Sequence, residues 1–268
     1  MIDFILRYMP PDYSAHGPAV DHLIGDIHVL MFVLFLFWAA FFALVLVRFR
    51  AGRARQANYA GMRSNWPLYA IAVTAAIEFF HLFAFSIPAW AQWASPLPNG
   101  GNPLEVRIVA EQFAWNAHYP GPDGIFGKRD VNLVSPDNPL GLDANDPHGK
   151  DDVATINELH LIANRPALIH ITSKDVIHSF KLPVMRAEQD AIPGMDIPIH
   201  FTPTRTNNGE NWEIACAQLC GLGHYRMRGM LVVDNQKDFQ QFEKDNTVNI
   251  VPPDVVPPAQ PTTTGAAQ

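Results

Sequence analysis

Two long apolar stretches dominate the N-terminal part of the chain. Residues 29–47 form an uninterrupted apolar and aromatic run, and residues 68–91 form a second run that only a few polar residues interrupt. At about 1.5 Å per helical residue, each run is long enough to cross a hydrocarbon layer about 30 Å thick. The pattern therefore predicts a transmembrane hairpin over 23–94, with helices over about 24–48 and 67–93.

The segment between these predicted helices, residues 49–66, decides their orientation. It carries several arginines and no acidic residue, and loops rich in positive charge stay in the cytoplasm. The N-terminal tail, residues 1–22, and the large C-terminal part are therefore expected on the outer, periplasmic side.

From residue 103 onward the sequence becomes polar, and short runs of apolar and β-branched residues are separated by turn residues. Such a pattern is typical of a β-sandwich or Greek-key barrel, so residues 103–235 are predicted to form one all-β domain. The predicted strands cover 104–119 (one strand, or two with a bend), 158–163, 167–173, 177–182, 197–201, 212–215 and 227–233.

Two other segments have a different composition. Residues 121–156 are dense in Gly, Asp, Asn and Pro, which predicts an exposed insertion. Residues 236–268 are predicted to form a short amphipathic helix around 239–242 and a disordered Pro-rich tail. The net charge of −7 disfavours nucleic acid as a partner and favours a basic one.

The candidate chemistry lies in one loop, residues 216–227. It contains both cysteines of the chain, Cys216 and Cys220, together with His224 and Met227. Thiolate, imidazole and thioether ligands suit copper in an electron-transfer role. One thiolate would make a mononuclear site, whereas two thiolates four residues apart can each bridge two metals, so the pattern favours a dinuclear centre. A disulfide is the alternative on the outer side of a membrane, but it leaves the histidine and the methionine without a role.

The loop needs one further ligand from elsewhere, and His178 is the best candidate. A histidine at the end of one strand and a Cys-rich loop between the last two strands is how cupredoxin-like sandwiches build copper sites. Through His178-Ser179-Phe180, residues 190–194 and the loop 216–227, the chain resembles subunit II of the haem-copper cytochrome c oxidases, which carries the dinuclear CuA centre. The resemblance includes the two-helix hairpin and covers about residues 20–235.

The resemblance implies a complete set of copper ligands, namely His178, Cys216, Gln218, Cys220, His224 and Met227. The two cysteines would bridge the coppers as thiolates. The first histidine and the methionine would complete one copper, while the second histidine and the backbone carbonyl of Gln218 would complete the other. The fold implied is a two-helix transmembrane hairpin followed by an all-β cupredoxin-like Greek-key sandwich or barrel.

Four residues mark where the chain and the family are compared most closely. The family usually has a glutamate at Gln218 that binds magnesium or manganese at the contact with subunit I, and the neutral amide argues against that metal site here. Phe113 stands where the family usually has an exposed tryptophan through which electrons enter, and Trp115 matches a later aromatic that either shares this role or packs in the core. Glu78 lies midway along the second predicted helix, where it serves proton uptake, a polar contact with subunit I, or packing in a protonated form.

The function implied is that of the subunit that receives electrons in a terminal respiratory oxidase. CuA would accept electrons from cytochrome c or a similar carrier and pass them to haem in subunit I, where oxygen is reduced to water with proton translocation. The haems and CuB belong to subunit I, so this chain would not reduce oxygen alone. The expected partners are subunit I, other oxidase subunits, the donor and the lipid of a bacterial inner or equivalent respiratory membrane, and acidic residues in 121–156 are expected to steer a basic donor. The alternative is a membrane-tethered copper carrier or assembly protein, which would need an exposed and exchangeable site.

Overall fold

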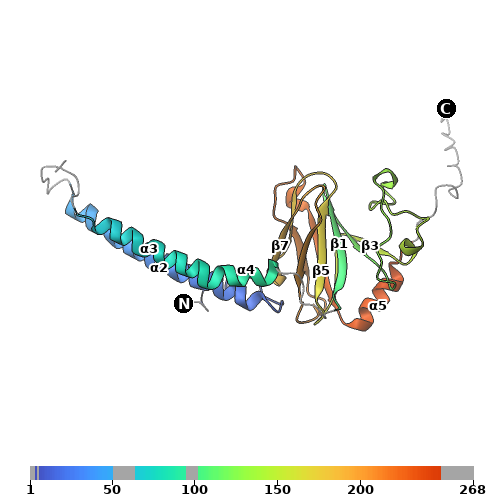
Figure 1. The fold of residues 1–268 in the computed structure, drawn as a ribbon, viewed down its shortest axis with the longest axis horizontal. Coiled ribbons are helices and arrows are strands. Elements are labelled where there is room, and N and C mark those ends of the chain that lie inside the picture. Colours follow the sequence, from blue (N-terminus) through green and yellow to red (C-terminus); the bar gives the residue numbers. More distant parts are fainter. Residues whose placement is uncertain (1–3, 5, 51–63, 95–101, 249–268) are drawn as a thin grey trace, which may run out of the picture. The chain divides into compact units, whose positions relative to one another are not determined.

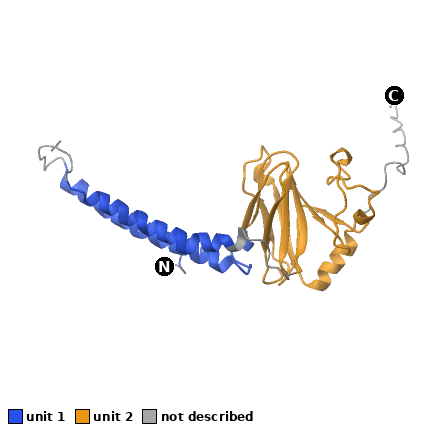
Figure 2. Cartoon of the chain, viewed as in Figure 1, with its two compact units in different colours: residues 1–99, 184–186 blue, residues 100–183, 187–268 orange. Residues whose placement is uncertain are grey.

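The computed structural model describes the chain in four stretches, residues 4, 6–50, 64–94 and 102–248. The chain divides into two compact units, one made of residues 1–99 with 184–186 and one made of residues 100–183 with 187–268 (Figure 2). The predicted disordered tail and most of the predicted arginine-rich loop lie outside the described residues.

The first unit contains two apolar helices that could span a membrane. Helix α2 (Gly17–Arg48) begins well before the predicted residue 24, so part of the predicted tail is helical. The second helix consists of α3 (Trp66–His81), a π-helical turn η2 (Leu82–Ser86) and α4 (Ile87–Ala94). Most apolar side chains of both helices are exposed in this chain, as expected for helices surrounded by lipid.

The π-helical turn has a cause in the sequence, because Pro88 lies two residues after its last residue, Ser86. Proline has no backbone N–H to donate four residues back, and its ring clashes with the carbonyl group at that position. The helix relieves this clash by widening locally, and the N–H of Ile87 bonds to the carbonyl of Leu82, five residues earlier.

The second unit is a sandwich of two five-stranded sheets, with strand orders β3-β2-β1-β5-β8 and β4-β10-β9-β6-β7 (Figure 1). The pairs β1·β5 and β4·β10 are parallel, and the other neighbours are antiparallel. The strands are β1 (Leu104–Glu111), β2 (Ala114–Tyr119), β3 (Val153–Ile156), β4 (Glu158–Ile162), β5 (Ala167–Ser173), β6 (His178–Leu182), β7 (Ala187–Ala191), β8 (Ile197–Phe201), β9 (Trp212–Cys216) and β10 (Arg228–Asp234).

The core lies between the two sheets and follows the alternation of the sequence. In β5, buried and partly exposed residues alternate along the whole strand. From β2, the ring of Trp115 packs edge-on against Phe180 of the opposite sheet, with ring centroids 5.4 Å apart. The sequence prediction of two apolar helices followed along the chain by a β-sandwich is therefore confirmed.

The segment 121–156 is only in part the exposed insertion that its composition predicts, because many of its residues are exposed but others are buried. Its end forms strand β3, which pairs with β2, and Leu140 and Leu142 are buried against Val109 on the outer face of the first sheet. Asp152 is fully buried, and its Oδ2 atom lies 2.6 Å from Nε2 of His118. The segment therefore covers part of the sheet, and we call residues 121–152 the cap.

Helix α5 (Gln236–Asp245) confirms the predicted amphipathic helix. The side chain of Asn235 accepts hydrogen bonds from the backbone N–H groups of Lys237 and Asp238 and so caps the helix. Phe239 and Phe242 are buried, and both rings contact the ring of Tyr119. The helix thus closes one edge of the sandwich.

His160 joins α5 to the sandwich. Its ring stacks on Phe242 at 3.8 Å, and its two nitrogens lie 2.6 Å from Asp234 and 2.9 Å from Glu158. Burial alone would lower the pKa of His160, but hydrogen bonds and charge interactions with the two carboxylates outweigh burial, and the pKa lies above its ordinary value. The imidazolium therefore stabilises this edge.

This shift predicts a pH-dependent stability. Because the folded-state pKa of His160 is raised, its contribution is complete below the unfolded-state pKa of about 6.5 and is lost as pH rises through the folded-state value. In thermal melts of the detergent-solubilised chain, His160→Gln should therefore lower the melting temperature most in acid, with a difference from wild type that shrinks as pH rises. A difference that is constant across this range would contradict the role of the charge.

Candidate metal centre

The ladder between β9 and β10 brings the two ends of the Cys-rich loop together. Cys216 ends β9, and its backbone N–H donates to the carbonyl oxygen of Met227, the residue before β10, at 3.3 Å. Between them the chain passes through Cys220 and a short 3-10 turn that begins at His224. The register of one hairpin thus places the backbones of a cysteine and a methionine side by side.

The neighbouring strand supplies the histidine. His178 is the first residue of β6, which pairs with β9 through Phe180 and Cys216. The N–H of Ala217 also donates to the carbonyl of Ser179 at 3.0 Å, which attaches the start of the loop to β6. His178 is fully buried and lies beneath the loop.

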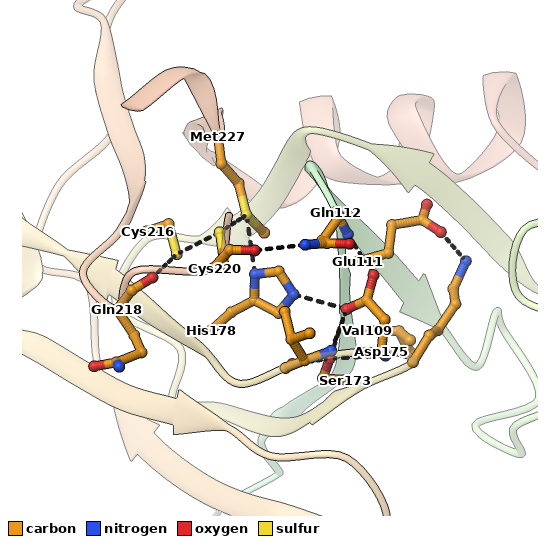
Figure 3. Close-up of polar contacts among 12 residues, drawn as sticks. Val109, Glu111, Gln112, Ser173, Asp175, His178, Cys216, Gln218, Cys220 and Met227 are labelled. Carbon is orange, nitrogen blue, oxygen red and sulfur yellow. Dashed lines mark hydrogen bonds and ion pairs between the residues drawn. The ribbon is translucent and has the colours of Figure 1, made fainter. Parts of the chain in front are cut away.

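The donor atoms converge on a small volume, as Figure 3 shows for the residues that it labels. The two cysteine sulfurs lie 3.8 Å apart, and Cys220 Sγ lies 3.7 Å from both His224 Nδ1 and Met227 Sδ. His178 Nδ1 lies 3.1 Å from Met227 Sδ, and the carbonyl oxygen of Gln218 lies 3.1 Å from Cys216 Sγ. Every predicted ligand atom thus has another within 3.8 Å.

These distances fit shared metal ions. Two sulfurs that each lie about 2.3 Å from one tetrahedral ion are about 3.8 Å apart, which is the separation of the two cysteine sulfurs. The ligand atoms of His178, Cys216 and Cys220 all lie within 4.8 Å of one another. The donor set of sulfur and imidazole nitrogen suits copper rather than a hard cation.

Both cysteines are free thiols, which contradicts the alternative of a disulfide. Burial, followed by the neighbouring Cys216 thiol, raises the pKa of Cys220 to about 11. A metal ion therefore displaces a proton when it binds this thiol.

A carboxylate fixes the orientation of His178. Its Nε2 lies 2.9 Å from Asp175 Oδ1, while Nδ1 faces the sulfur atoms (Figure 3). Because the carboxylate can only accept, it favours the tautomer that carries the proton on Nε2 and leaves the lone pair of Nδ1 free for a metal. Burial would raise the pKa of Asp175, but its hydrogen bonds from His178 and from the N–H groups of Gln112 and Val176 lower it overall, so the group stays ionised.

Gln112 supports the other side of the centre. Its side-chain amide donates to the carbonyl of Cys220 at 2.6 Å, and its backbone N–H donates to Asp175 Oδ2 at 2.7 Å. One residue therefore contacts both the Cys-rich loop and the support of His178. The sequence patterns did not identify Gln112 or Asp175, although a carboxylate three residues before a candidate histidine ligand is a usable signal for Asp175.

The two aromatic candidates lie in different environments. Phe113 is 37% exposed, and its ring covers Gly221 and Gly223 of the loop so closely that a β-carbon at Gly223 would overlap it. Trp115 is only 1% exposed and packs between His178 and Phe180. Phe113 is thus the surface aromatic over the loop, and Trp115 is a core residue that touches one ligand.

The side chains of two predicted residues lie apart from this cluster. The side chain of Gln218 is exposed, so only its backbone carbonyl takes part in the cluster. Glu78 is an exposed residue of α3 in the first unit, near the middle of the second apolar helix. Its assignment to proton uptake, or to a polar contact with another subunit, stays a prediction.

The fold and the cluster define a cupredoxin-like domain with a sulfur-rich candidate metal site, carried by a chain with two apolar helices. The family described as "Cytochrome C oxidase subunit II, periplasmic domain" matches residues 104–235. A relative from Bradyrhizobium diazoefficiens, "Alternative cytochrome c oxidase subunit 2", is 35% identical over 205 residues, which are 75% of this chain and 71% of the relative.

Other comparisons give related proteins. "Cytochrome c oxidase subunit 2" of Thermostichus vulcanus is 25% identical over 262 residues, covering 89% of this chain and 78% of the relative. The crystal structure of the periplasmic domain of subunit II of cytochrome oxidase from Bradyrhizobium japonicum is 25% identical, with a TM-score of 0.40, and covers 56% of this chain and 96% of that domain. The chain belongs to the cytochrome c oxidase subunit II family, as its sequence predicts.

Membership of this family fixes the broad function. The chain is a membrane-anchored subunit of an oxidoreductase complex and carries a copper-binding domain. The cluster of one histidine and two cysteines is the candidate site of its metal.

Proposed function

We propose that this chain is the subunit through which electrons enter a terminal respiratory oxidase. A dinuclear CuA centre in the outer domain accepts them from cytochrome c or a similar carrier and passes them to haem in subunit I. There oxygen is reduced to water with proton translocation. The observation that carries the proposal is the convergence of five side-chain donors and one carbonyl, with neighbouring atoms 3.1 to 3.8 Å apart.

The geometry supports one division of the ligands. Cys216 and Cys220 would hold the coppers jointly as thiolates, because their separation equals that of two sulfurs on a shared ion. His178 and Met227 belong to one copper, since their donor atoms are neighbours. The Gln218 carbonyl lies beside Cys216, and His224 lies beside Cys220. The resemblance to the family implies that these two would complete the second copper.

The protein surroundings suit electron transfer. Bound copper would supply a one-electron couple shared over two bridged ions. The chain holds His178 in one tautomer through Asp175, and it buries three of the ligand side chains, His178, Cys220 and Met227. A shell without an open position excludes substrate and favours electron transfer over catalysis. Buried ligands also argue against a copper carrier, which needs an exchangeable site.

Electron paramagnetic resonance of the copper-loaded full chain in detergent tests the proposal. Two equivalent coppers that share one unpaired electron give a seven-line hyperfine pattern, and the copper content should be two per chain. A four-line pattern with one copper per chain would overturn the dinuclear assignment. A metal that chelators remove as fast as from an open peptide site would instead favour the copper carrier.

Phe113 is the residue through which we propose that electrons enter, because it is the exposed aromatic packed on the loop. Phe113→Ala should slow electron uptake from the donor about tenfold, the lower end of the range for residues that support metal ligands. Phe113→Trp keeps an aromatic surface and should retain most of the rate. Stopped-flow reduction of the copper centre in the assembled oxidase measures both. Equal rates for wild type and Phe113→Ala would contradict this role.

A further inference from the structure

A second polar site lies on the opposite face of the first sheet from the sandwich core. The cap and the outer face of β1 and β5 line an open pocket of about 370 Å³. Its walls include Arg107, Phe126, Arg129, Val131, Val134 and Thr172, and also one carboxylate, that of Asp130, which accepts hydrogen bonds from Asn132. This volume lies within the usual range for small-molecule sites of about 300 to 1,000 Å³.

Two arginines face this pocket without a counter-ion in contact. Within the described residues, neither Arg107 nor Arg129 forms an ion pair. The guanidinium of Arg107 lies over the ring of Phe126, 4.0 Å from its centroid, and this contact fixes its position. Partial burial lowers the pKa of both arginines, and the charge of Arg107 lowers the pKa of Arg129 further.

The surroundings compensate these charges only in part. Asp196 is near enough to raise the pKa of both arginines, and Asp152 and Glu105 also raise the pKa of Arg107. The carboxylate of Asp196 is exposed and lies 3.1 Å from a nitrogen of His170, and the carboxylate of Asp152 is paired with His118. Lys174, also in the pocket wall, is already paired with Glu111 at 2.6 Å. The pocket therefore contains two like charges that an anion between them would relieve.

We propose that this pocket binds a small phosphate-bearing anion, either inorganic phosphate or a soluble phosphate monoester. Two guanidinium groups offer planar pairs of N–H donors that match the oxygens of a tetrahedral oxyanion. The hydroxyl group of Thr172 adds a neutral donor, and Val131 and Val134 provide an apolar wall for an organic substituent. None of these residues belongs to the metal centre, so the site is a separate one on the same domain.

Titration calorimetry of the detergent-solubilised full chain with inorganic phosphate tests this site. Sodium chloride holds the ionic strength constant, so that general screening does not vary. Wild type should show saturable binding of one phosphate per chain. Arg129→Gln and Arg107→Gln should each weaken it about tenfold or more, as expected for the loss of a charge-assisted hydrogen bond.

Two further variants separate binding from folding. Asp196→Asn removes the competing carboxylate and should tighten binding, a gain that a folding defect does not produce. Lys150→Gln removes an exposed positive charge from the cap outside the pocket and should change the affinity less than about twofold. Binding that is not saturable, or that Lys150→Gln weakens as much as Arg129→Gln does, would overturn the site. Binding that occurs only in nanodiscs with anionic phospholipid would overturn it as well.

Discussion

Cys220→Ser will abolish the proposed dinuclear copper centre and with it the proposed electron uptake by the oxidase. Cys220 Sγ is the donor with the most neighbours in the cluster, within 3.8 Å of Cys216 Sγ, His224 Nδ1 and Met227 Sδ. A serine hydroxyl is a hard and weakly acidic ligand, so it cannot bridge two coppers as a thiolate does. Turnover should fall by more than about a hundredfold, because even the loss of an outer partner of a metal ligand commonly costs about 10- to 100-fold.

Three measurements check this expectation. The copper content should fall from two per chain, the seven-line resonance pattern should disappear, and turnover with a reduced donor should be lost. Cys216→Ser should give the same result if both thiolates bridge. Met230→Leu is the matched control, because it removes an exposed thioether outside the ligand cluster and should change none of the three. A seven-line pattern that persists in Cys220→Ser would contradict the bridging role.

The sequence predicted the residues whose donor atoms the structure brings together, because most of them lie within one short loop. Ligand chemistry is a property of residue types, and the spacing of Cys216, Cys220, His224 and Met227 requires little knowledge of the fold. The support of His178 is different. Gln112 and Asp175 are 63 residues apart in the chain, yet the backbone N–H of Gln112 bonds to the carboxylate of Asp175.

Topology explains this long-range contact. Strands β1 and β5 are parallel neighbours, with Ala110 opposite Ser173. The residues that follow the two strands therefore meet at the same end of the sheet. Sequence spacing does not reveal which strands are neighbours, so these supporting residues could not be predicted from it.

The strands show the same division between local and non-local information. Strand β5 is predicted at its observed bounds because one of its faces is buried and the sequence alternates accordingly. Strand β7 (Ala187–Ala191) is an edge strand with the sequence AEQDA, and only its last residue is buried. Its backbone pairing with β6 defines it, and apolar periodicity does not reveal such pairing.

The buried part of the cap was not predicted, because composition is an average over the whole segment. Its many Gly, Asp, Asn and Pro residues are typical of solvated loops, but a few residues decide where it lies. Leu140, Leu142 and Asp152 are buried against the outer face of the sheet. These residues attach the whole segment to the sheet. An aspartate in a polar stretch gives no sign in the sequence that it is fully buried.

Asp152→Ala will destabilise the β-sandwich domain more than other changes of a polar residue in the cap. The carboxylate is fully buried and accepts hydrogen bonds from the backbone N–H of Gly127 at 2.9 Å and from His118 Nε2 at 2.6 Å. Burial, the largest influence, lowers the pKa of His118, so a neutral imidazole that has lost its partner cannot easily gain a compensating charge. Two buried donors would then lack an acceptor.

The expected cost of Asp152→Ala is about 3 kcal/mol, since each unsatisfied buried donor costs about 1 to 3 kcal/mol. For a unit of this size that corresponds to a melting temperature lower by roughly 6 to 12 °C, which calorimetry of the solubilised chain measures. Asp137→Ala is the matched control, because it removes an exposed carboxylate from the same cap, and its effect should stay within about 0.5 kcal/mol. Limited proteolysis should also cut the cap faster in Asp152→Ala, because the buried carboxylate holds it against β2. Equal melting temperatures for Asp152→Ala and Asp137→Ala would show that the pair between Asp152 and His118 does not anchor the cap.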